Sequence, residues 1–473
     1  MTRSELMTAG TASCSPAPNR CGRVSYHPAR MRRAVPGPTP RELLPRLREL
    51  QQDPLEFLLE LARRYGPFVR IPVPGLHVFS IAQPDAVKHV LQDNARNYSK
   101  RTLQFTNLAL VTGQGLLTSD GEFWLRQRRM AQPAFHRQRI AGFGGAMTGA
   151  ALRMLERWKA KQDGVLDLDH EMMEMTLEVV GLTLFSSDFS AAAKRMVEAT
   201  LTALDYVIHK AQNPFGPPAW VPTMRNRRFR QALDVLDRAV YRLIEERRAR
   251  GQPHDDLLSM LLEARDDDGQ PMTLRQLRDE LITVIIAGHE TVASALTWTW
   301  HLLAQHPQAE AKLHAELAQV LGGRTPTMDD LPRLPYTRAV FEEALRLYPP
   351  AWLITRRATG PDTVGGYPIP RGSLLVLSPY ITHRQAEAWP EPETFRPERF
   401  LEDARPPRYA YIPFGGGPRL CIGNTFALVE GQLILATVAQ HYRLRPAGPK
   451  PVEAAPLVTI RPKGGLWMRL ERR

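Results

Sequence analysis

The segment 414–423 places one cysteine where a cysteine can act as a metal ligand. It reads Phe-Gly-Gly-Gly-Pro-Arg-Leu-Cys-Ile-Gly and stands directly before a helical pattern at 424–440. The dipole and the free N–H groups at a helix start, with Arg419 nearby, stabilise a thiolate at Cys421. A phosphate-binding loop is not expected, because the Lys-Ser/Thr ending is missing and Pro418 has no N–H to donate. The sequence therefore predicts a thiolate ligand at Cys421.

A second polar interruption lies within the longest helical pattern, 273–304. The middle of this pattern is almost wholly apolar, so the helix is expected inside the protein. The segment 287–291 then reads Ala-Gly-His-Glu-Thr. The glycine weakens the helix by about 1 kcal/mol, and the Thr291 hydroxyl can bond back to the carbonyl four residues earlier, so the two can open a local groove. No second histidine follows at the turn that a zinc site requires, so zinc is not expected.

Helical patterns must position these two segments, because they dominate the chain. Apolar residues recur at three-to-four spacing at 54–64, 121–135, 144–160, 168–184, 230–250, 273–304, 308–320, 336–347 and 424–440. Thr273 and Gln276 form a capping box at the start of the longest pattern. Short β-like runs occur at 68–73, 77–81, 374–377 and 457–460. This predicts a mainly α domain with small β-sheets (α+β) and no alternating βαβ units.

Composition narrows the class of protein further. The 473 residues carry 62 Lys and Arg against 49 Asp and Glu, a net charge of +13 that favours an acidic partner. The three cysteines form neither a disulfide framework nor a zinc pattern, which suits a cytoplasmic setting. Residues 1–33 lack a continuous apolar core and are expected to be a disordered leader before one domain at 34–473. No segment is expected to span a membrane, and no nucleic-acid-binding module is found.

Four signatures, in order, resemble those of the cytochrome P450 family, over roughly residues 36 to 470. Phe414, Gly417, Arg419, Cys421 and Gly423 match the haem-thiolate loop of that family. Glu343 and Arg346 resemble its Glu-x-x-Arg pair, and Arg399 in the segment 397–400 resembles the second arginine of its buried triad. The segment 287–291 is similar to the oxygen-activating stretch of its long central I helix.

The resemblance implies a site for haem b with Cys421 as the iron ligand. Trp124 and Arg128 look like the pair that meets a haem propionate, and Arg419 and Arg356 resemble further propionate partners. The remaining residues implied to surround the haem are Phe414 and Gly423. The triad of Glu343, Arg346 and Arg399 is expected to be structural and to hold the segment that precedes Cys421.

The resemblance also implies a haem-thiolate monooxygenase that uses O2 and two electrons. The thiolate favours cleavage of the O–O bond, and Thr291 with Glu290 delivers protons. The electrons are expected to come from NAD(P)H through separate proteins, a ferredoxin or flavodoxin and its reductase. A basic surface around Cys421 would attract such an acidic donor. The protein is expected to be a monomer. A haem-based sensor or carrier without turnover is the alternative from a different class, and a peroxide-driven enzyme is disfavoured by the presence of Glu290 and Thr291.

The substrate is expected to be large and apolar. The residues predicted to line its pocket share an apolar character: Phe105, Leu108, Ile286, Ala287, Trp352 and Leu353. The stretch 347–357 resembles bacterial hydroxylases that act on the β-ring of carotenoids, and access to such a substrate would allow a loose association with membranes. A fatty-acid hydroxylase is the alternative, and a basic residue at 101–113 would distinguish it; Arg101 alone is basic there.

Overall fold

The computed structural model describes residues 34–161, 164–213, 216–251, 254–266, 268–403, 406–449 and 451–473. The predicted leader at 1–33, with Cys14 and Cys21, lies outside the described residues. Ala34–Arg473 forms one compact unit.

The described chain is mainly helical, as predicted. The α-helices are α1 Pro40–Leu43, α2 Leu47–Gln52, α3 Pro54–Tyr65, α4 Pro84–Lys88, α5 Leu103–Thr112, α6 Gly121–Ala131, α7 Arg137–Gly142, α8 Gly144–Lys159, α9 Leu168–Leu184, α10 Ala193–Gln212, α11 Met224–Arg250, α12 Leu257–Glu263, α13 Leu274–Gln305, α14 Pro307–Leu321, α15 Pro335–Leu347, α16 Pro379–Thr382 and α17 Asn424–His441. All nine predicted helical patterns correspond to helices, although α6 ends at Ala131 and a 3₁₀ turn completes that pattern. Eight α-helices of the described residues were not predicted; the two longest of them, α5 and α10, have no side-chain cap.

The strands form small sheets. They are β1 Phe68–Val73, β2 Leu76–Ile81, β3 Tyr98–Ser99, β4 Val165–Asp167, β5 Ile354–Ala358, β6 Asp362–Val364, β7 Tyr367–Ile369, β8 Leu374–Leu377, β9 Tyr442–Pro446, β10 Ala454–Pro456, β11 Ile460–Pro462 and β12 Trp467–Arg472. The largest sheet has the order β1-β2-β8-β5-β3, in which only β2 and β8 run parallel. The other sheets have the orders β4-β12-β9, β10-β11 and β6-β7.

The strand predicted near 457–460 is displaced, because only Ile460 lies in a strand, as the first residue of β11. Residues 457–459 form the turn between β10 and β11, in which the Leu457 N–H lies 2.9 Å from the Ala455 carbonyl oxygen and 3.1 Å from that of Thr459. The apolar side chains that suggested a strand belong to a turn that lies against the protein interior, where burial requires apolar residues without requiring extended backbone. The hairpin β10-β11 contacts α13 through hydrogen bonds to the Ile460 carbonyl.

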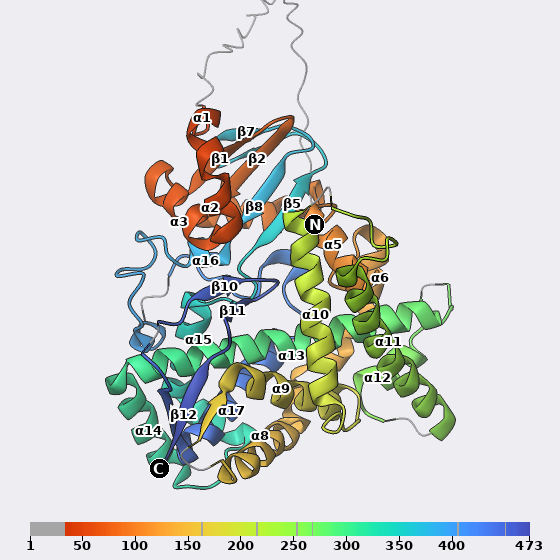
Figure 1. Ribbon diagram of the computed structural model, residues 1–473, viewed down its shortest axis with the longest axis vertical. Helices are drawn as coiled ribbons and strands as arrows, with labels where there is room; N and C mark the ends of the chain where they lie inside the picture. Colours follow the sequence, from red (N-terminus) through yellow and green to blue (C-terminus); the bar gives the residue numbers. More distant parts are fainter. Residues whose placement is uncertain are drawn as a thin grey trace, which may run out of the picture. The chain divides into compact units, whose positions relative to one another are not determined.

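Helix α13 crosses the middle of the described unit, between the largest sheet and the group of α8, α9, α14 and α17 (Figure 1). It begins with the predicted capping box, in which Thr273 and Gln276 each accept the other's backbone N–H. Among the described helices it alone is long and apolar enough to cross a membrane, but most of it is buried inside the protein, which is typical of a core helix. It contacts α5, α15 and α17, which lie at or beside the candidate site.

Candidate functional site

The loop before α17 holds Cys421 through its own backbone. The Cys421 N–H donates to the Phe414 carbonyl at 3.0 Å, which closes the glycine-rich segment into a loop around the 3₁₀ turn Gly417–Arg419. Gly417 has a φ of 66°, and a Cβ there would lie 1.8 Å from the Leu91 carbonyl oxygen. Only glycine fits both constraints. The loop therefore presents Cys421 just before the N-terminus of α17.

The Cys421 side chain is enclosed and yet accessible. Surrounding protein raises the pKa of its thiol, while the Gly423 N–H and the Arg128 charge oppose that rise. The residue nevertheless keeps exposed surface. The thiol is therefore within reach of a ligand although protein surrounds it. A Cβ at Gly423 would meet only the Phe135 ring, at 3.8 Å, so the protein itself does not require glycine there.

Two partly buried cations lie beside this loop. The Arg419 guanidinium lies 4.0 Å from the centre of the Trp124 ring, donates to the Ser119 carbonyl at 3.0 Å and pairs with Asp120. Arg128, four residues after Trp124 on α6, donates to the Leu420 carbonyl at 3.0 Å. Arg419 thus lies within the loop of Cys421, and Arg128 contacts that loop from α6.

Two further cations complete this group, and one of them was not predicted. Arg356 on β5 is buried, and burial with the nearby Arg419 charge lowers its pKa to about 10. Lys100 is buried as well, with its ammonium 2.7 Å from the Leu117 carbonyl oxygen and 4.7 Å from the centre of the Phe105 ring. Burial, followed by the charges of Arg356 and Arg419, holds the pKa of Lys100 well below its usual range. The sequence offered no periodic signal for Lys100, which the fold brings to the group.

This cationic group fits a dianionic ligand. The four cations of this group act on one another electrostatically: Lys100, Arg128, Arg356 and Arg419. Within the described residues, the Asp120 carboxylate opposes this repulsion by raising the pKa of Lys100, Arg356 and Arg419. Buried like charges are costly unless an anion balances them. Two propionate groups would supply that anion, and arginine binds carboxylates through two parallel hydrogen bonds. The residues present therefore fit haem, for which Cys421 would be the iron ligand.

Within its buried part, helix α13 is accessible at one turn only. Every residue from Leu277 to Leu303 is buried except Ala287, Gly288 and Thr291, which lie on one turn. The Thr291 hydroxyl donates to the Ala287 carbonyl at 2.7 Å, as the sequence predicted. The partly accessible turn on an otherwise buried helix has the position that a groove for a small ligand such as O2 would need.

The side chains of the two residues before Thr291 form hydrogen bonds with other partners. Glu290 is buried and accepts a hydrogen bond from the Thr459 hydroxyl at 2.9 Å, so its carboxyl faces the hairpin β10-β11 and not Thr291. Burial raises the pKa of Glu290 to about 7. The His289 Nδ1 bonds the Ile285 carbonyl at 2.6 Å, and burial lowers the pKa of this ring to about 4. His289 is therefore a neutral core residue near pH 7.

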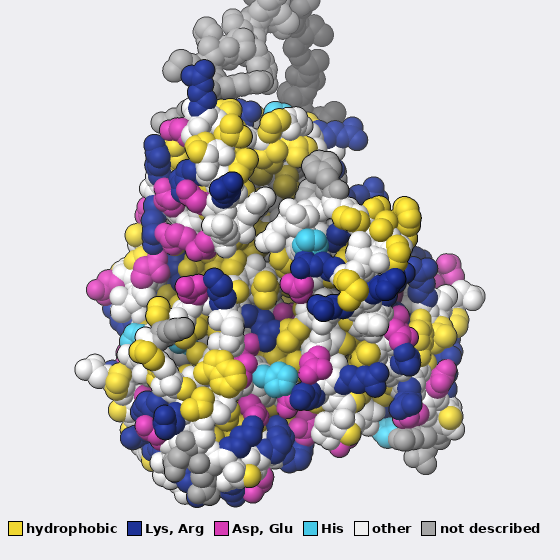
Figure 2. Space-filling view, in the orientation of Figure 1, with side chains coloured by type: hydrophobic (Ala, Val, Ile, Leu, Met, Phe, Trp, Pro, Cys, Tyr) yellow, Lys and Arg dark blue, Asp and Glu magenta, His cyan; other side chains and the backbone are white. Residues whose placement is uncertain are grey.

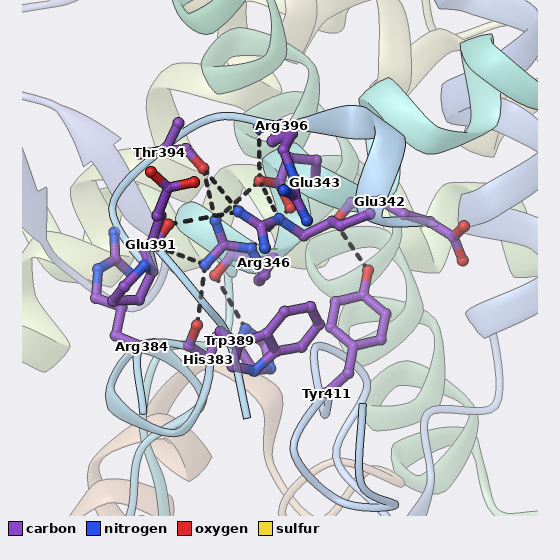
Figure 3. A network of polar contacts seen from close by, with 12 residues as sticks. Glu342, Glu343, Arg346, His383, Arg384, Trp389, Glu391, Thr394, Arg396 and Tyr411 are labelled. Atoms are coloured by element: carbon purple, nitrogen blue, oxygen red, sulfur yellow. Dashed lines mark hydrogen bonds and ion pairs between the residues drawn. The ribbon is translucent and has the colours of Figure 1, made fainter. Parts of the chain in front are cut away.

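The predicted triad forms one buried network (Figure 3). Arg346 donates to both oxygens of Glu343, at 2.7 and 2.8 Å, and Arg399 donates to one of them at 3.0 Å. Glu343 and Arg346 are fully buried, and Arg399 nearly so. Figure 3 shows the two side chains from α15 meeting the segment that carries Thr394 and Arg396.

The triad connects to the cysteine loop through His383. Arg346 donates to the carbonyls of His383 and Pro392 at 3.0 and 2.7 Å. The His383 Nε2 accepts the Ile412 N–H at 2.8 Å, so its Nδ1 carries the proton and donates to the Arg346 carbonyl at 3.0 Å. Ile412 stands two residues before Phe414. The network therefore fixes the chain that leads into the loop of Cys421.

The predicted pocket residues come from three elements. Phe105 and Leu108 are buried on α5, and Ile286 and Ala287 lie on α13. The Trp352 indole N–H donates to the Leu457 carbonyl at 2.9 Å, which joins the stretch before β5 to the β10-β11 turn. Leu353 is half-buried, and its carbonyl accepts from the Gln104 side chain at 3.0 Å. Gln104 thus ties α5 to β5, a contact that the sequence did not predict.

The cysteine before α17, the group of buried and partly buried cations beside it and the accessible turn of α13 define a haem-thiolate protein. A family model described as cytochrome P450 matches residues 35–468. The chain belongs to the cytochrome P450 family, and it is a cytochrome P450 monooxygenase.

Several curated relatives are similar over most of their length. Cyclooctatin synthase from Streptomyces melanosporofaciens is 38% identical over 87% of this chain and 90% of its own. Pentalenene oxygenase from Streptomyces avermitilis is 35% identical over 90% of this chain and 94% of its own. The chloroplastic protein LUTEIN DEFICIENT 5 from Arabidopsis thaliana is 33% identical over 88% of this chain and 74% of its own.

Proposed function

We propose that this monooxygenase hydroxylates a large apolar terpenoid. The reaction consumes O2, two electrons and two protons and yields the alcohol and water. Haem, when bound, supplies the activation of O2 and of the C–H bond. The observation that carries the proposal is the single accessible turn at Ala287, Gly288 and Thr291 within an otherwise buried helix.

The residues of this chain hold the cofactor and handle protons. Cys421 is the iron ligand, and Arg128, Arg356, Arg419 and Lys100 hold the propionates. The Thr291 hydroxyl positions water at the opened turn of α13. Glu290 supplies protons from its buried carboxyl, whose pKa of about 7 lets it both hold and release a proton near neutral pH.

The substrate class is supported by the pocket and by the relatives. The wall formed by Phe105, Leu108, Ile286, Trp352 and Leu353 is apolar. The names of the relatives refer to cyclooctatin, pentalenene and lutein, which are all terpenoids. Within that class we propose the β-ring of a carotenoid, in line with the stretch 347–357 and with LUTEIN DEFICIENT 5.

A fatty-acid hydroxylase is the second candidate. Its substrate carboxylate would need a cation on the pocket wall, and Arg101, beside Lys100, is exposed. Lys100 itself belongs to the cationic group proposed for the propionates. A sensor or carrier without turnover would leave the Glu290 carboxyl and the opened turn of α13 without a use.

The electrons come from NAD(P)H through a ferredoxin or flavodoxin and its reductase. A net charge of +13 attracts such acidic donors. On the face shown in Figure 2, Lys and Arg side chains are interspersed with Asp and Glu, so this face carries no continuous basic field. We propose that the donor docks near the loop of Cys421, that the enzyme acts as a monomer, and that it works in the cytoplasm.

A binding screen tests the substrate class. Carotenoids, cyclic terpenes and long-chain fatty acids are each added to the haem-loaded protein, and the low-to-high spin shift of the absorption spectrum is followed. We expect terpenoids to give the shift at lower concentration than any fatty acid. A shift with fatty acids alone would replace the terpenoid proposal with the second candidate.

A further inference from the structure

The hairpin β10-β11 is fastened to α13 by one carbonyl group. The Ile460 carbonyl accepts the Ser294 hydroxyl at 2.7 Å and the Trp298 indole N–H at 2.9 Å. Thr459, the last residue of the turn, and Arg461 of β11 flank Ile460, and both are buried. The same attachment therefore brings two polar side chains into the protein interior beside α13.

Each of these side chains meets a buried carboxyl group. Thr459 donates to the Glu290 Oε1 at 2.9 Å, and Arg461 forms an ion pair with Asp169 at the start of α9. All four residues are buried. Asp169 also accepts the Thr297 hydroxyl of α13 at 3.4 Å. Arg461 therefore pairs with the buried carboxyl group on α9, while the residue two positions before it holds the buried carboxyl group on α13.

The charges of this cluster act on Glu290 in opposite directions. Burial raises the pKa of Glu290 most, Arg461 and the Thr459 hydrogen bond lower it, and Asp169 raises it. His289, the neighbouring titratable group, is neutral near pH 7 because burial holds its pKa at about 4. A hydroxyl can donate to a carboxylate or accept from a carboxylic acid, so Thr459 can hold Glu290 in both protonation states.

We propose that Arg461 is a positioning residue for the acid of α13: it shares its charge between Asp169 and Glu290 and so sets whether Glu290 holds a proton. This inference rests on the proton-supplying role proposed for Glu290. Thr459 fixes the distance between the two partners because it lies two residues before Arg461 on the same segment. The pair Asp169–Arg461 thus acts on the opened turn of α13 from outside the haem site.

Two substitutions with opposite expected signs test this arrangement in the haem-loaded protein. The readout is the infrared band of the Glu290 carboxylic acid, assigned by its loss in Glu290→Gln and followed against pH. Arg461→Met removes the cation and raises the midpoint of Glu290 by about one pH unit or more, whereas Asp169→Asn frees the cation and lowers it by a similar amount. The double variant returns the midpoint close to that of the unchanged protein.

Matched variants separate electrostatics from damage to the fold. Arg461→Lys keeps the charge and should keep the midpoint near the original value. Arg247→Met breaks another buried ion pair, with Asp256, and should leave the midpoint unchanged. If both single variants shift the midpoint in the same direction, or neither shifts it, the inference is overturned.

The same variants distinguish failure of this inference from failure of the proposed function. The infrared midpoint does not depend on turnover. Opposite shifts together with an altered pH dependence of electron-to-product coupling support both statements. Opposite shifts with an unchanged pH dependence support the pairing of Arg461 with Glu290 and overturn the proton-supplying role of Glu290.

Discussion

Cys421, Thr291 and Lys100 show how differently single residues can be predicted. Cys421 and Thr291 stand in segments whose composition already indicates chemistry, so the sequence was sufficient to select them. Lys100 has no such context, because its function arises from Arg356 and Arg419, which lie far along the chain. The orientation of Glu290 could not be predicted either: neighbouring helix residues point about 100° apart, and its partner Thr459 is 169 residues away.

Replacing Thr291 by alanine should separate haem binding from proton handling. Thr291→Ala removes the hydroxyl at the opened turn but no contact with the cationic group, so haem should be retained. We expect product formed per electron to fall about tenfold, with the difference appearing as peroxide. Oxygen uptake, peroxide and product are measured together. Thr291→Ser keeps the hydroxyl and should stay well coupled; unchanged coupling in Thr291→Ala would contradict the role.

Replacing Lys100 should loosen the haem. Lys100→Met keeps the length of the side chain and removes one buried cation, and a hydrogen bond to a charged group is worth about 1.5 kcal/mol or more, so haem should leave about tenfold faster. Transfer of haem to an acceptor protein measures this rate. The neighbouring Arg101 is exposed, and Arg101→Met serves as the control. Equal rates in both variants would remove Lys100 from the propionate site.

At the scale of elements, periodicity predicted most helices but not their partners. Helix α13 was recognised from its capping box and apolar middle. Helix α5 was missed because its apolar residues do not gather on one face, and α10 was missed as well. The turn between β10 and β11 was mistaken for part of a strand because Leu457 and Val458 are apolar. The contact of β10-β11 with α13 depends on the whole fold and leaves no local pattern.

The network of α15 offers a direct test of its structural role. Glu343→Gln leaves Arg346 and Arg399 without a buried counter-charge, which should destabilise the protein by about 3 to 5 kcal/mol and reduce haem incorporation. The adjacent Glu342 pairs with the half-exposed Arg338, so Glu342→Gln should cost less than about 1 kcal/mol. Urea unfolding of both variants checks this. Similar losses in both would show that the triad has no special role.

Helix α13 also carries a carboxyl group that should make stability depend on pH. Glu280 accepts the Leu116 N–H at 3.0 Å, and burial raises its pKa from 4.5 to about 8. The folded state therefore holds a proton that the unfolded state has released between about pH 4.5 and pH 8, so stability falls as pH rises through this window. Glu280→Gln keeps an acceptor for Leu116 and should remove about 1 to 3 kcal/mol of this dependence.

Melting temperatures across this pH window provide the measurement. The exposed Glu263 supplies the control, because Glu263→Gln should leave the pH dependence of the unchanged protein intact. If Glu280→Gln melts with the same pH dependence as the unchanged protein, Glu280 is ionised in the folded state.

At the scale of the whole molecule, the described unit from Ala34 to Arg473 joins one cysteine, one cationic group and one opened helix. The family match at 35–468 covers nearly all of it. The composition alone left the cysteine and the charge of +13 without assigned roles. The fold places Cys421 beside a group of four cations, of which Lys100 and Arg356 are buried and Arg128 and Arg419 partly buried.

The absorption spectrum of the reduced, carbon monoxide-bound protein tests the central claim most directly. With Cys421 as a thiolate ligand, the Soret band should be strongly shifted to the red, and Cys421→His should return it to the position of imidazole-ligated haem. An imidazole-like band in the freshly purified, unchanged protein would contradict the assignment of Cys421 as the iron ligand.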